Sequence, residues 1–497
     1  MVPSTSKRSN SDPAGNNRNQ LDPVLLSSAS FPHAVDSIRL IETHISWVVL
    51  TGKYAYKIKK PVRFAFVDYS TLSLRKHYCH EELRLNSRLA PDIYLNVVPV
   101  MNCLGKLNFN GDGELIDCAV RMKEFPQSSI FAAQLADGLV TTQHIDELGR
   151  LIAQFHKTAE VATSSALTSA DHLYEQTYDN VDYLSKFFKR GSRKSVLEQT
   201  AEWVRNRFTQ LKPVFQERNT GNFVRQCHGD MHLENIIIFN GKVQVFDCIE
   251  FNPELQWIDC LNDLAFPVMD LLAHDRPDLA ARLLSIYLEE SGDYAGLQPL
   301  NFFQVYRALV RAKVSLMRDE SSAAAKSKSE KYLDVAAELT KARTPHLWIT
   351  YGVSGSGKST AAMRLVESLG AVRIRSDVER NRLFDQSPAD VKYSADTTDV
   401  VYQHLAALAE SVICSGYSVV VDATFLKRRH RELFSEIAHR MGLPFGIIEC
   451  DANPETLRQR ISARAGDASE ATIEILAGQL KSREPLTAEE MSVTCKA

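Results

Sequence analysis

The chain has 497 residues, which is too long for one ordinary hydrophobic core, so two or three domains are expected. A hydrophobic fraction of 44%, a charged fraction of 24% and a net charge of −3 are typical of a soluble globular protein and exclude a general attraction to nucleic acid or anionic membranes. The nine scattered cysteines include no CxxC pair, and no apolar run reaches the roughly 20 residues of a membrane helix. We therefore expect a cytoplasmic protein with no disulfide framework, zinc site or membrane partner.

The first thirty residues differ from the rest of the chain in composition. Residues 1–30 are rich in Ser, Asn, Pro and Asp and contain no apolar segment of the kind found in signal peptides. Because they can bury little apolar surface, folding would not offset the loss of conformational entropy. We expect a disordered tail over residues 1–30 and ordered structure from Phe31 onward.

A first domain is expected over residues 31–343, with short strands followed by long helices. Two β-prone runs flank the turn at 51–53 and predict a hairpin. The expected elements are, in order, strands at 47–50 and 54–59, a helix over 72–89, strands at 95–100 and 118–125, helices over 142–158 and within 181–215, and strands at 236–238 and 243–246 around the turn Asn240–Gly241. Helices are then expected to about residue 343.

The domain boundary is expected at Thr344–Pro345. Before it, the Ser-, Ala- and Lys-rich segment 321–329 predicts an exposed loop, and residues 332–342 predict a last helix. Beyond it, four expected strands alternate with helix-length segments, a pattern typical of an α/β domain with a parallel sheet. These strands lie at 346–351, 372–374, 418–421 and 445–450. The second domain is therefore expected over residues 344–497.

A phosphate-binding loop directly follows the first strand of this second domain. It reads Gly352-Val353-Ser354-Gly355-Ser356-Gly357-Lys358-Ser359-Thr360 and matches the Walker A pattern in full. Glycines let backbone N–H groups close around phosphates, while Lys358 supplies a cation to the β- and γ-oxygens and Ser359 a hydroxyl to Mg²⁺. The strand before the loop and the helix after it support an ATP-binding P-loop.

Two carboxylates follow later strands of the same domain. Asp377 and Asp422 each come at the end of an expected strand, the edge at which ligands bind in open α/β sheets. There Asp377 can accept the proton of an acceptor hydroxyl, with Arg380 holding the acceptor. Asp422 can ligate the metal through water or orient that base. The alternative for Asp377 is a helix N-cap, and for Asp422 a turn or cap.

Three arginines end the next expected helix and enter a loop. Arg460 and Arg464 are interpreted as residues that close over the γ-phosphate and stabilise its charge during transfer. For Arg458, a solvated helix face is an equal alternative.

The region from about residue 345 resembles the P-loop kinases that include gluconate kinase, zeta toxins and polynucleotide kinase. Ser376-Asp377 followed by Arg380, together with Asp422-Ala423-Thr424, is most similar to the polynucleotide kinase branch. The resemblance implies that Asp377 is the base and that Arg380 contacts the acceptor.

A second set of kinase-type residues lies in the first domain. Asp230 follows His228-Gly229, Asn235 comes five residues later, and Asp247 ends the expected strand pair. Kinase chemistry needs one carboxylate at the acceptor, and an amide and a second carboxylate to hold Mg²⁺ against the phosphates.

This set resembles the aminoglycoside phosphotransferase and choline kinase-like superfamily, which has a protein-kinase-like fold. The resemblance implies that Asp230 is the catalytic base, that Asn235 and Asp247 are metal ligands, and that Lys57 binds ATP with Glu82 as its ion-pair partner. Lys59 and Lys60 remain alternatives to Lys57, and Glu81 is the alternative to Glu82.

Nearly the whole chain resembles bacterial proteins in which such a domain is fused to an ATP-binding kinase domain. We interpret the chain as a bifunctional Mg²⁺-dependent kinase with ATP and small-molecule acceptors. The alternatives are a polynucleotide 5′-hydroxyl kinase, which the charge balance does not favour, and a regulatory pseudokinase in the first domain. Carboxylates for a polycationic acceptor could come from Asp259, Asp263 and Asp270, although a capping or core-edge role is the preferred interpretation.

A cationic stripe suggests an anionic acceptor for the first domain. In the expected helix 305–318, Arg307 and Arg311 share the face opposite the apolar positions, where they can clamp a carboxylate or phosphate. The alternative is a solvated cationic face.

Overall fold

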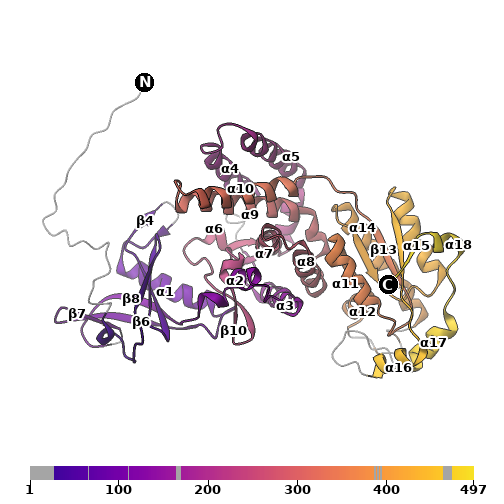
Figure 1. Cartoon of the computed structure of the whole chain (residues 1–497), viewed down its shortest axis with the longest axis horizontal. Coiled ribbons are helices and arrows are strands. Elements are labelled where there is room, and N and C mark those ends of the chain that lie inside the picture. The colour runs from indigo at the N-terminus through magenta and orange to yellow at the C-terminus, as the bar shows by residue number, and fades with distance from the viewer. Residues whose placement is uncertain are drawn as a thin grey trace. The chain divides into compact units, whose positions relative to one another are not determined.

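The computed structural model describes residues 27–462 and 473–497, apart from 65–66, 110, 164–169, 386–387, 389–390 and 392–393 (Figure 1). Most of the predicted tail lies outside the described residues. Its last residues form a short 3-10 helix, η2 (Ser28–Ser30), because the Ser27 hydroxyl caps the Ala29 N–H and Ser30 is buried. Ordered structure therefore begins slightly earlier than predicted.

The chain divides into two compact units. The first comprises residues 1–129 and 244–255, and the second comprises 130–243 and 256–497. The boundary predicted between residues 343 and 344 falls inside the second unit and stays a prediction. No helix among the described residues combines the length and apolar character needed to cross a membrane, and all nine cysteines are free.

An antiparallel six-stranded sheet forms the body of the first unit, in the order β1-β2-β3-β8-β6-β7. Its strands are β1 (Arg39–Glu42), β2 (Ser46–Leu50), β3 (Tyr54–Lys59), β6 (Tyr94–Cys103), β7 (Lys106–Phe109) and β8 (Glu114–Lys123), with the short strands β4 (Arg63–Phe64) and β5 (Val67–Asp68) apart from it. The predicted hairpin of β2 and β3 is confirmed by their antiparallel pairing. Aromatic and branched side chains, among them Trp47, Val49 and Tyr56, fill the core on this sheet.

One long helix packs against this sheet. Helix α1 (Leu72–Asn86) begins after Thr71, whose hydroxyl accepts the Leu74 N–H at 3.2 Å. It contacts β6 and β8 and places Glu82 on its fully buried side.

The second unit begins with a helical region that confirms most of the predicted helices. Its longer helices are α2 (Phe131–Ala136), α3 (Thr142–Thr158), α4 (Ala170–Ser185), α5 (Ser192–Thr220), α7 (Cys260–Ala273), α8 (Pro277–Ser291), α9 (Leu297–Arg318) and α10 (Ala323–Leu339). Short strands β9 (Val224–Gln226) and β12 (Trp257–Asp259) pair, and β10 (Ile236–Phe239) and β11 (Lys242–Val245) follow the segment that contains Asp230. The predicted turn between them is found at Asn240 and Gly241, both with positive φ.

One prediction for this region is wrong. The segment 321–329 is not an exposed loop, because α10 starts at Ala323, capped by the Ser322 hydroxyl. Residues from Ala323 are good helix formers, and Ser329 is buried against α9, so tertiary packing extends the helix beyond the predicted 332–342.

The C-terminal part contains the predicted parallel sheet. Its strand order is β14-β15-β13-β16-β17, and each strand pairs with its neighbours in parallel. The strands are β13 (Leu347–Tyr351), β14 (Val372–Arg375), β15 (Val419–Asp422), β16 (Phe445–Glu449) and β17 (Thr494–Lys496), and the helices are α11 (Lys358–Leu369), α12 (Ser376–Leu383), α14 (Ala395–Cys414), α15 (Arg428–Arg440), α16 (Pro454–Ser462), α17 (Ile473–Ser482) and α18 (Ala488–Ser492). The predicted α/β class with a parallel sheet is confirmed for this part, and the preceding part combines an antiparallel sheet with helices, as the predicted α+β class requires.

Candidate active sites

The P-loop has the backbone geometry that a phosphate cradle requires. Gly352, Gly355 and Gly357 have φ of 155°, 84° and 98°, a region that favours glycine. A Cβ on Gly352 would lie 2.3 Å from the Cys450 carbonyl oxygen, so no other residue fits there. The Lys358 ammonium donates to the Val353 carbonyl at 2.8 Å, inside the loop. The sequence thus builds an anion-sized cradle at the start of α11.

Two cavities meet at this loop. One, of about 790 Å³, is lined by the loop from Gly355 to Ala361 and by Arg364, Glu449, Asp451 and Arg460. The other, of about 520 Å³, is lined by the carboxyl ends of β14 and β15 and by α14, α15 and α17. Both include Lys358 and Ser359, so these two side chains mark the place where the cavities join. A nucleotide in the first cavity would therefore direct its terminal phosphate toward the second.

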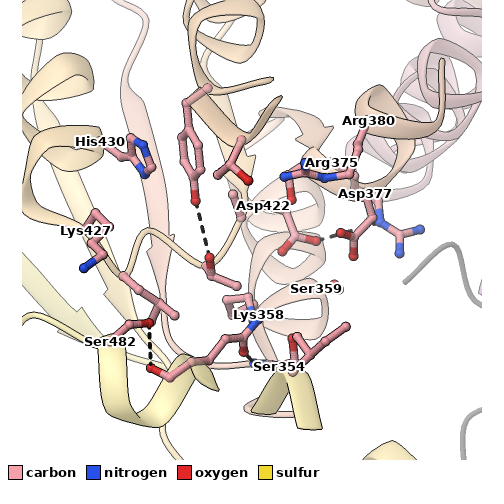
Figure 2. Close-up of a pocket in the computed structure, with 18 of the residues that line it drawn as sticks. Ser354, Lys358, Ser359, Arg375, Asp377, Arg380, Asp422, Lys427, His430 and Ser482 are labelled. Atoms are coloured by element: carbon pink, nitrogen blue, oxygen red, sulfur yellow. Dashed lines mark hydrogen bonds and ion pairs between the residues drawn. The ribbon is translucent and has the colours of Figure 1, made fainter. Parts of the chain in front are cut away.

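The second cavity brings together most of the predicted residues (Figure 2). Asp377 lies in the first turn of α12 rather than at its cap, which is Arg375 without a side-chain cap bond. Asp422 is the last residue of β15, and Arg380 is buried on α12. Figure 2 shows Asp377, Arg375 and Arg380 at one end of the cavity and Lys427 and His430 at the other.

Of the two arginines predicted to close over the γ-phosphate, Arg460 and Arg464, the structure describes only Arg460. Arg460 lines the larger cavity and donates to the Gly355 carbonyl at 3.1 Å, which places it directly on the P-loop. Thr360, the last residue of the motif, lines the same cavity. Arg464 lies outside the described residues.

In the first unit, a buried network of charges surrounds Lys57. The Lys57 ammonium lies 2.8 Å from Glu82 and donates to Asp247 at 2.6 Å. Lys59, fully buried, also pairs with Glu82 at 2.8 Å and with Glu250. The structure therefore brings the predicted Lys57, Glu82 and Asp247 together. The alternative acid, Glu81, instead pairs with Arg84 at the surface.

Neighbouring charges decide the protonation of this network. Burial alone would lower the pKa of Lys57, but Asp247 and Glu82 outweigh it and hold that pKa well above its usual range. For Glu82, burial opposes ionisation, yet Lys57 and Lys59 bring its pKa below the usual value. Asp247 has φ of 62°, a left-handed conformation fixed by the bond from its N–H to the Tyr94 hydroxyl at 3.2 Å. Lys57 and Glu82 are thus both held in their charged forms.

In the second unit, Asp230 and Asn235 contact each other directly. The Asn235 amide donates to the Asp230 carbonyl at 2.9 Å and to its carboxylate at 3.1 Å. His232, which the sequence analysis did not select, lies 3.4 Å from the same carboxylate. Burial would raise the pKa of Asp230, but His232 and then Arg311 overcome it and lower this pKa to about 2. Asp230 is therefore ionised at neutral pH and carries no proton of its own.

Two aspartates of α7 hold the loop that carries Asp230. Asp263 accepts the N–H groups of His228 and Gly229, each at 2.9 Å, and Asp270 accepts the Leu233 N–H at 2.8 Å. Both are fully buried. These contacts agree with the preferred interpretation, a structural role. They do not agree with the alternative, an open carboxylate surface that binds a polycation.

The sequence contains a signal that could have identified the structural role of Asp263 and Asp270. They lie seven residues apart on one face of an otherwise apolar helix, and a buried carboxylate needs donors. Asp259 is different, because it caps α7 through the Leu261 N–H and pairs with the buried Arg218.

The predicted acceptor clamp on α9 is not open. Arg307 and Arg311 are only 3% and 4% exposed, so neither a solvated face nor an accessible stripe is found. Arg307 donates to the Gly229 carbonyl at 3.1 Å, and Arg311 pairs with Glu234 at 3.0 Å. Helices α7 and α10 cover α9, so these arginines contact the loop that carries Asp230 from inside the protein. Their role in binding the acceptor stays a prediction.

Comparison with known proteins gives the following matches. The family model described as AAA domain matches residues 347–486, which confirms the P-loop part. Uncharacterized protein Rv2004c of Mycobacterium tuberculosis (strain ATCC 25618 / H37Rv) is 30% identical over 449 residues, 88% of this chain and 88% of that protein. This match spans both predicted modules, so the predicted bacterial combination of the two is confirmed.

Solved structures are similar to each region separately. Plasmodium vivax ethanolamine kinase is 12% identical, with 61% of this chain and 82% of that chain covered and a TM-score of 0.38. A gluconokinase from Sinorhizobium meliloti 1021 is 23% identical, with 31% and 82% covered and a TM-score of 0.24.

Proposed function

This chain belongs to the same family as Rv2004c of Mycobacterium tuberculosis, and we propose that it is a bifunctional ATP-dependent phosphotransferase. Each of its two kinase-type sites transfers the γ-phosphate of ATP to a hydroxyl group of a small molecule. The observation that carries this proposal is that Lys358 and Ser359 line both cavities of the P-loop site. One cavity has the contacts of a nucleotide site, and the other presents a carboxylate to an acceptor.

At the P-loop site, the residues divide into four roles. Backbone N–H groups between Gly352 and Gly357, together with Lys358, hold the phosphates. Asp377 takes the proton of the acceptor hydroxyl, and Arg380 positions the acceptor. Arg460, already on the loop, adds positive charge beside the phosphates.

At the other site, Asp230 is the base that accepts the hydroxyl proton. Because its pKa is lowered, Asp230 is ionised at neutral pH and can accept a hydrogen bond from the acceptor hydroxyl. The same low pKa makes it a weak base. It therefore orients the hydroxyl first and takes the proton only as the phosphate is transferred. Lys57, aimed by Glu82, contacts the phosphates of ATP. His232 and Asn235 keep the Asp230 carboxylate in one orientation.

The residue types present fit Mg²⁺. Carboxylate, amide and hydroxyl oxygens are the ligands that Mg²⁺ prefers, and at the P-loop site they occur as Ser359 with Asp422. For the other site we assign Asp247 of the first unit and Asn235 of the second unit as metal ligands. Ser359 opens α11 directly after the cradle, and Asp422 lines the same cavity as Ser359. When bound, Mg²⁺ neutralises charge on the β- and γ-phosphate oxygens.

The test separates the two sites in the full-length chain. We expect two molecules of the non-hydrolysable ATP analogue AMP-PNP to bind per chain and Lys358→Ala to abolish one of them, because each site has its own phosphate contacts. Turnover at the P-loop site should fall by roughly 10²–10³-fold, the usual effect of losing one charge-stabilising donor. Calorimetric titration measures the stoichiometry.

Acceptors are then identified by ATP consumption with polyols, sugar acids, nucleosides, aminoglycosides and 5′-hydroxyl oligonucleotides, in the parent chain and in Lys358→Ala. An acceptor whose phosphorylation disappears in Lys358→Ala belongs to the P-loop site. Loss of both bound nucleotides in this variant would contradict two independent sites. Phosphorylation of oligonucleotides alone would favour the polynucleotide kinase alternative.

A further inference from the structure

We propose that Glu289, on helix α8 of the helical region, is a positioning residue of the P-loop site. It holds Arg373 and Arg375 and thereby keeps Asp422 available to the metal. The inference rests on the proposed function, since it assigns Asp422 to Mg²⁺. It also makes the P-loop site dependent on a side chain that precedes the predicted domain boundary.

Glu289 joins two arginines of strand β14. Its Oε2 lies 2.7 Å from an Arg373 Nη and its Oε1 lies 2.8 Å from an Arg375 Nη, so one carboxylate serves both guanidinium groups. The carboxylate is 11% exposed, and the two arginine side chains are 7% and 14% exposed. Charge-assisted bonds in so little water are short and directional.

The backbone of the same helix strengthens this link. Ser285, one turn before Glu289, accepts the Arg373 N–H at 3.2 Å through its hydroxyl, and the Glu289 carbonyl accepts from Arg382 at 2.6 Å. Ile286 packs with Ala362 and Val366 of α11, the helix that the P-loop opens. In Figure 1, α8 and α11 lie side by side, as these contacts require.

The position of Glu289 in its helix is itself unfavourable. It lies in the last turn of α8, where the helix dipole disfavours a negative charge. Burial adds a desolvation cost that only paired cations offset. Arg373 and Arg375 supply that compensation, so the three charges form one unit.

Both arginines lie close to residues of the proposed phosphate and metal site. Arg373 approaches the Ser359 carbonyl at 3.5 Å, and Arg375 lines the acceptor cavity with its Nε 3.9 Å from the Asp422 carboxylate. At 3.9 Å this second contact is an ion pair without a hydrogen bond. Without Glu289, Arg375 would be released toward the Asp422 carboxylate, 3.9 Å away, and would close on it. Asp422 would then be neutralised by an arginine and would lose affinity for Mg²⁺.

The test measures how much Mg²⁺ strengthens nucleotide binding. AMP-PNP is titrated into the full-length chain with and without Mg²⁺, and the binding that Lys358→Ala removes is assigned to the P-loop site. We expect Glu289→Gln to reduce the Mg²⁺-dependent gain in affinity by roughly 10–100-fold, as for partners that orient metal ligands, and to leave metal-free binding nearly unchanged. The matched control is Glu290→Gln, the next residue of α8, whose half-exposed carboxylate faces Arg150 at 3.5 Å and should leave the gain unchanged.

A second substitution distinguishes positioning from a merely structural role. Adding Arg375→Gln to Glu289→Gln should restore most of the Mg²⁺-dependent gain, because Asp422 is released. Unchanged Mg²⁺ dependence in Glu289→Gln, or no restoration in the double variant, would overturn the inference. If the parent chain bound no AMP-PNP that Lys358→Ala removes, the proposed function itself would be wrong, and this inference with it. Circular dichroism checks folding, and Glu289→Asp, too short to reach both arginines, replaces Glu289→Gln if that variant does not fold.

Discussion

The two kinase-type sites are built in opposite ways. The P-loop takes its phosphate contacts from nine consecutive residues, Gly352 to Thr360, and depends on backbone conformations that glycine permits. The Lys57 network joins residues as far apart as Lys57 and Asp247, which are separated by 190 positions. In the first case the local sequence is sufficient, and in the second tertiary packing must hold each charge in place.

This difference predicts different consequences of mutation. Loss of the Lys358 side chain should affect ligand binding more than folding, because its hydrogen bond to Val353 stays within the loop that binds the ligand. A residue of a dispersed charge network has buried protein partners, so its loss affects stability and function together. The following predictions test that contrast.

The largest effect is expected at Asp230. Asp230→Asn keeps the shape of the side chain and its contact with Asn235 but removes the charge that orients the acceptor hydroxyl. ATP affinity should stay within a few-fold, while transfer falls by about 10²–10⁴-fold, the usual range for a general base. Single-turnover transfer and calorimetric ATP affinity measure the two effects separately.

Asp275→Asn is the control, because its carboxylate is 89% exposed and pairs only with the surface residue Lys331 among the contacts described for it. An equal loss of ATP binding and turnover in Asp230→Asn would identify Asp230 as a metal ligand instead of a base.

The two lysines of β3 should separate stability from binding. Lys59 is fully buried between Glu82 and Glu250, so Lys59→Met leaves two buried carboxylates short of a partner and should cost about 3–5 kcal/mol of unfolding free energy. Lys57→Met leaves Glu82 paired with Lys59 and should chiefly weaken ATP binding. Urea unfolding and nucleotide titration of both variants measure this contrast.

A Lys57→Met chain that was as unstable as Lys59→Met, with unchanged nucleotide binding, would reverse the assignment. Lys59 would then be the nucleotide-binding lysine, which the sequence analysis left open as an alternative.

A smaller effect is expected on the stability of the fold at acid pH, which depends on the ionisation of Asp263. Burial opposes its charge, but His156 and the N–H groups of the catalytic loop lower its pKa from 3.8 to about 2. Since the folded-state pKa is the lower one, Asp263 stabilises the fold above pH 3.8, and this contribution is lost as pH falls to about 2. The contribution should be about 2 kcal/mol.

Thermal unfolding between pH 3.8 and about 2 measures the contribution of Asp263 to stability, in the parent and in Asp263→Asn. The variant should be less stable at neutral pH, because an amide oxygen cannot replace both carboxylate acceptors, and its stability should decline less between these pH values. Parallel pH profiles for parent and variant would contradict this role of Asp263.

Much of the fold was predictable from local patterns. The P-loop, the strands β13 to β16, the hairpin of β2 and β3 and the helix α3 all follow from turn residues, apolar periodicity and Walker A spacing, which are properties of neighbouring residues. The misplaced elements are those in which long-range packing overrides local preference. Helix α10 replaced an expected loop because Ser329 is buried against α9.

The sequence by itself determined which residues have the chemistry of the two proposed ATP sites, because phosphate and metal binding demand particular residue types at particular spacings. Only the tertiary structure decided which charges neutralise one another. In the folded chain Lys57 pairs with Glu82 and not with Glu81, and Arg307 and Arg311 point into the protein. Glu289 pairs with Arg373 and Arg375, which lie 84 and 86 positions further along the chain. The physical reason is that ion pairing depends on distance and burial in space, and neither is encoded in the spacing of residues along the chain.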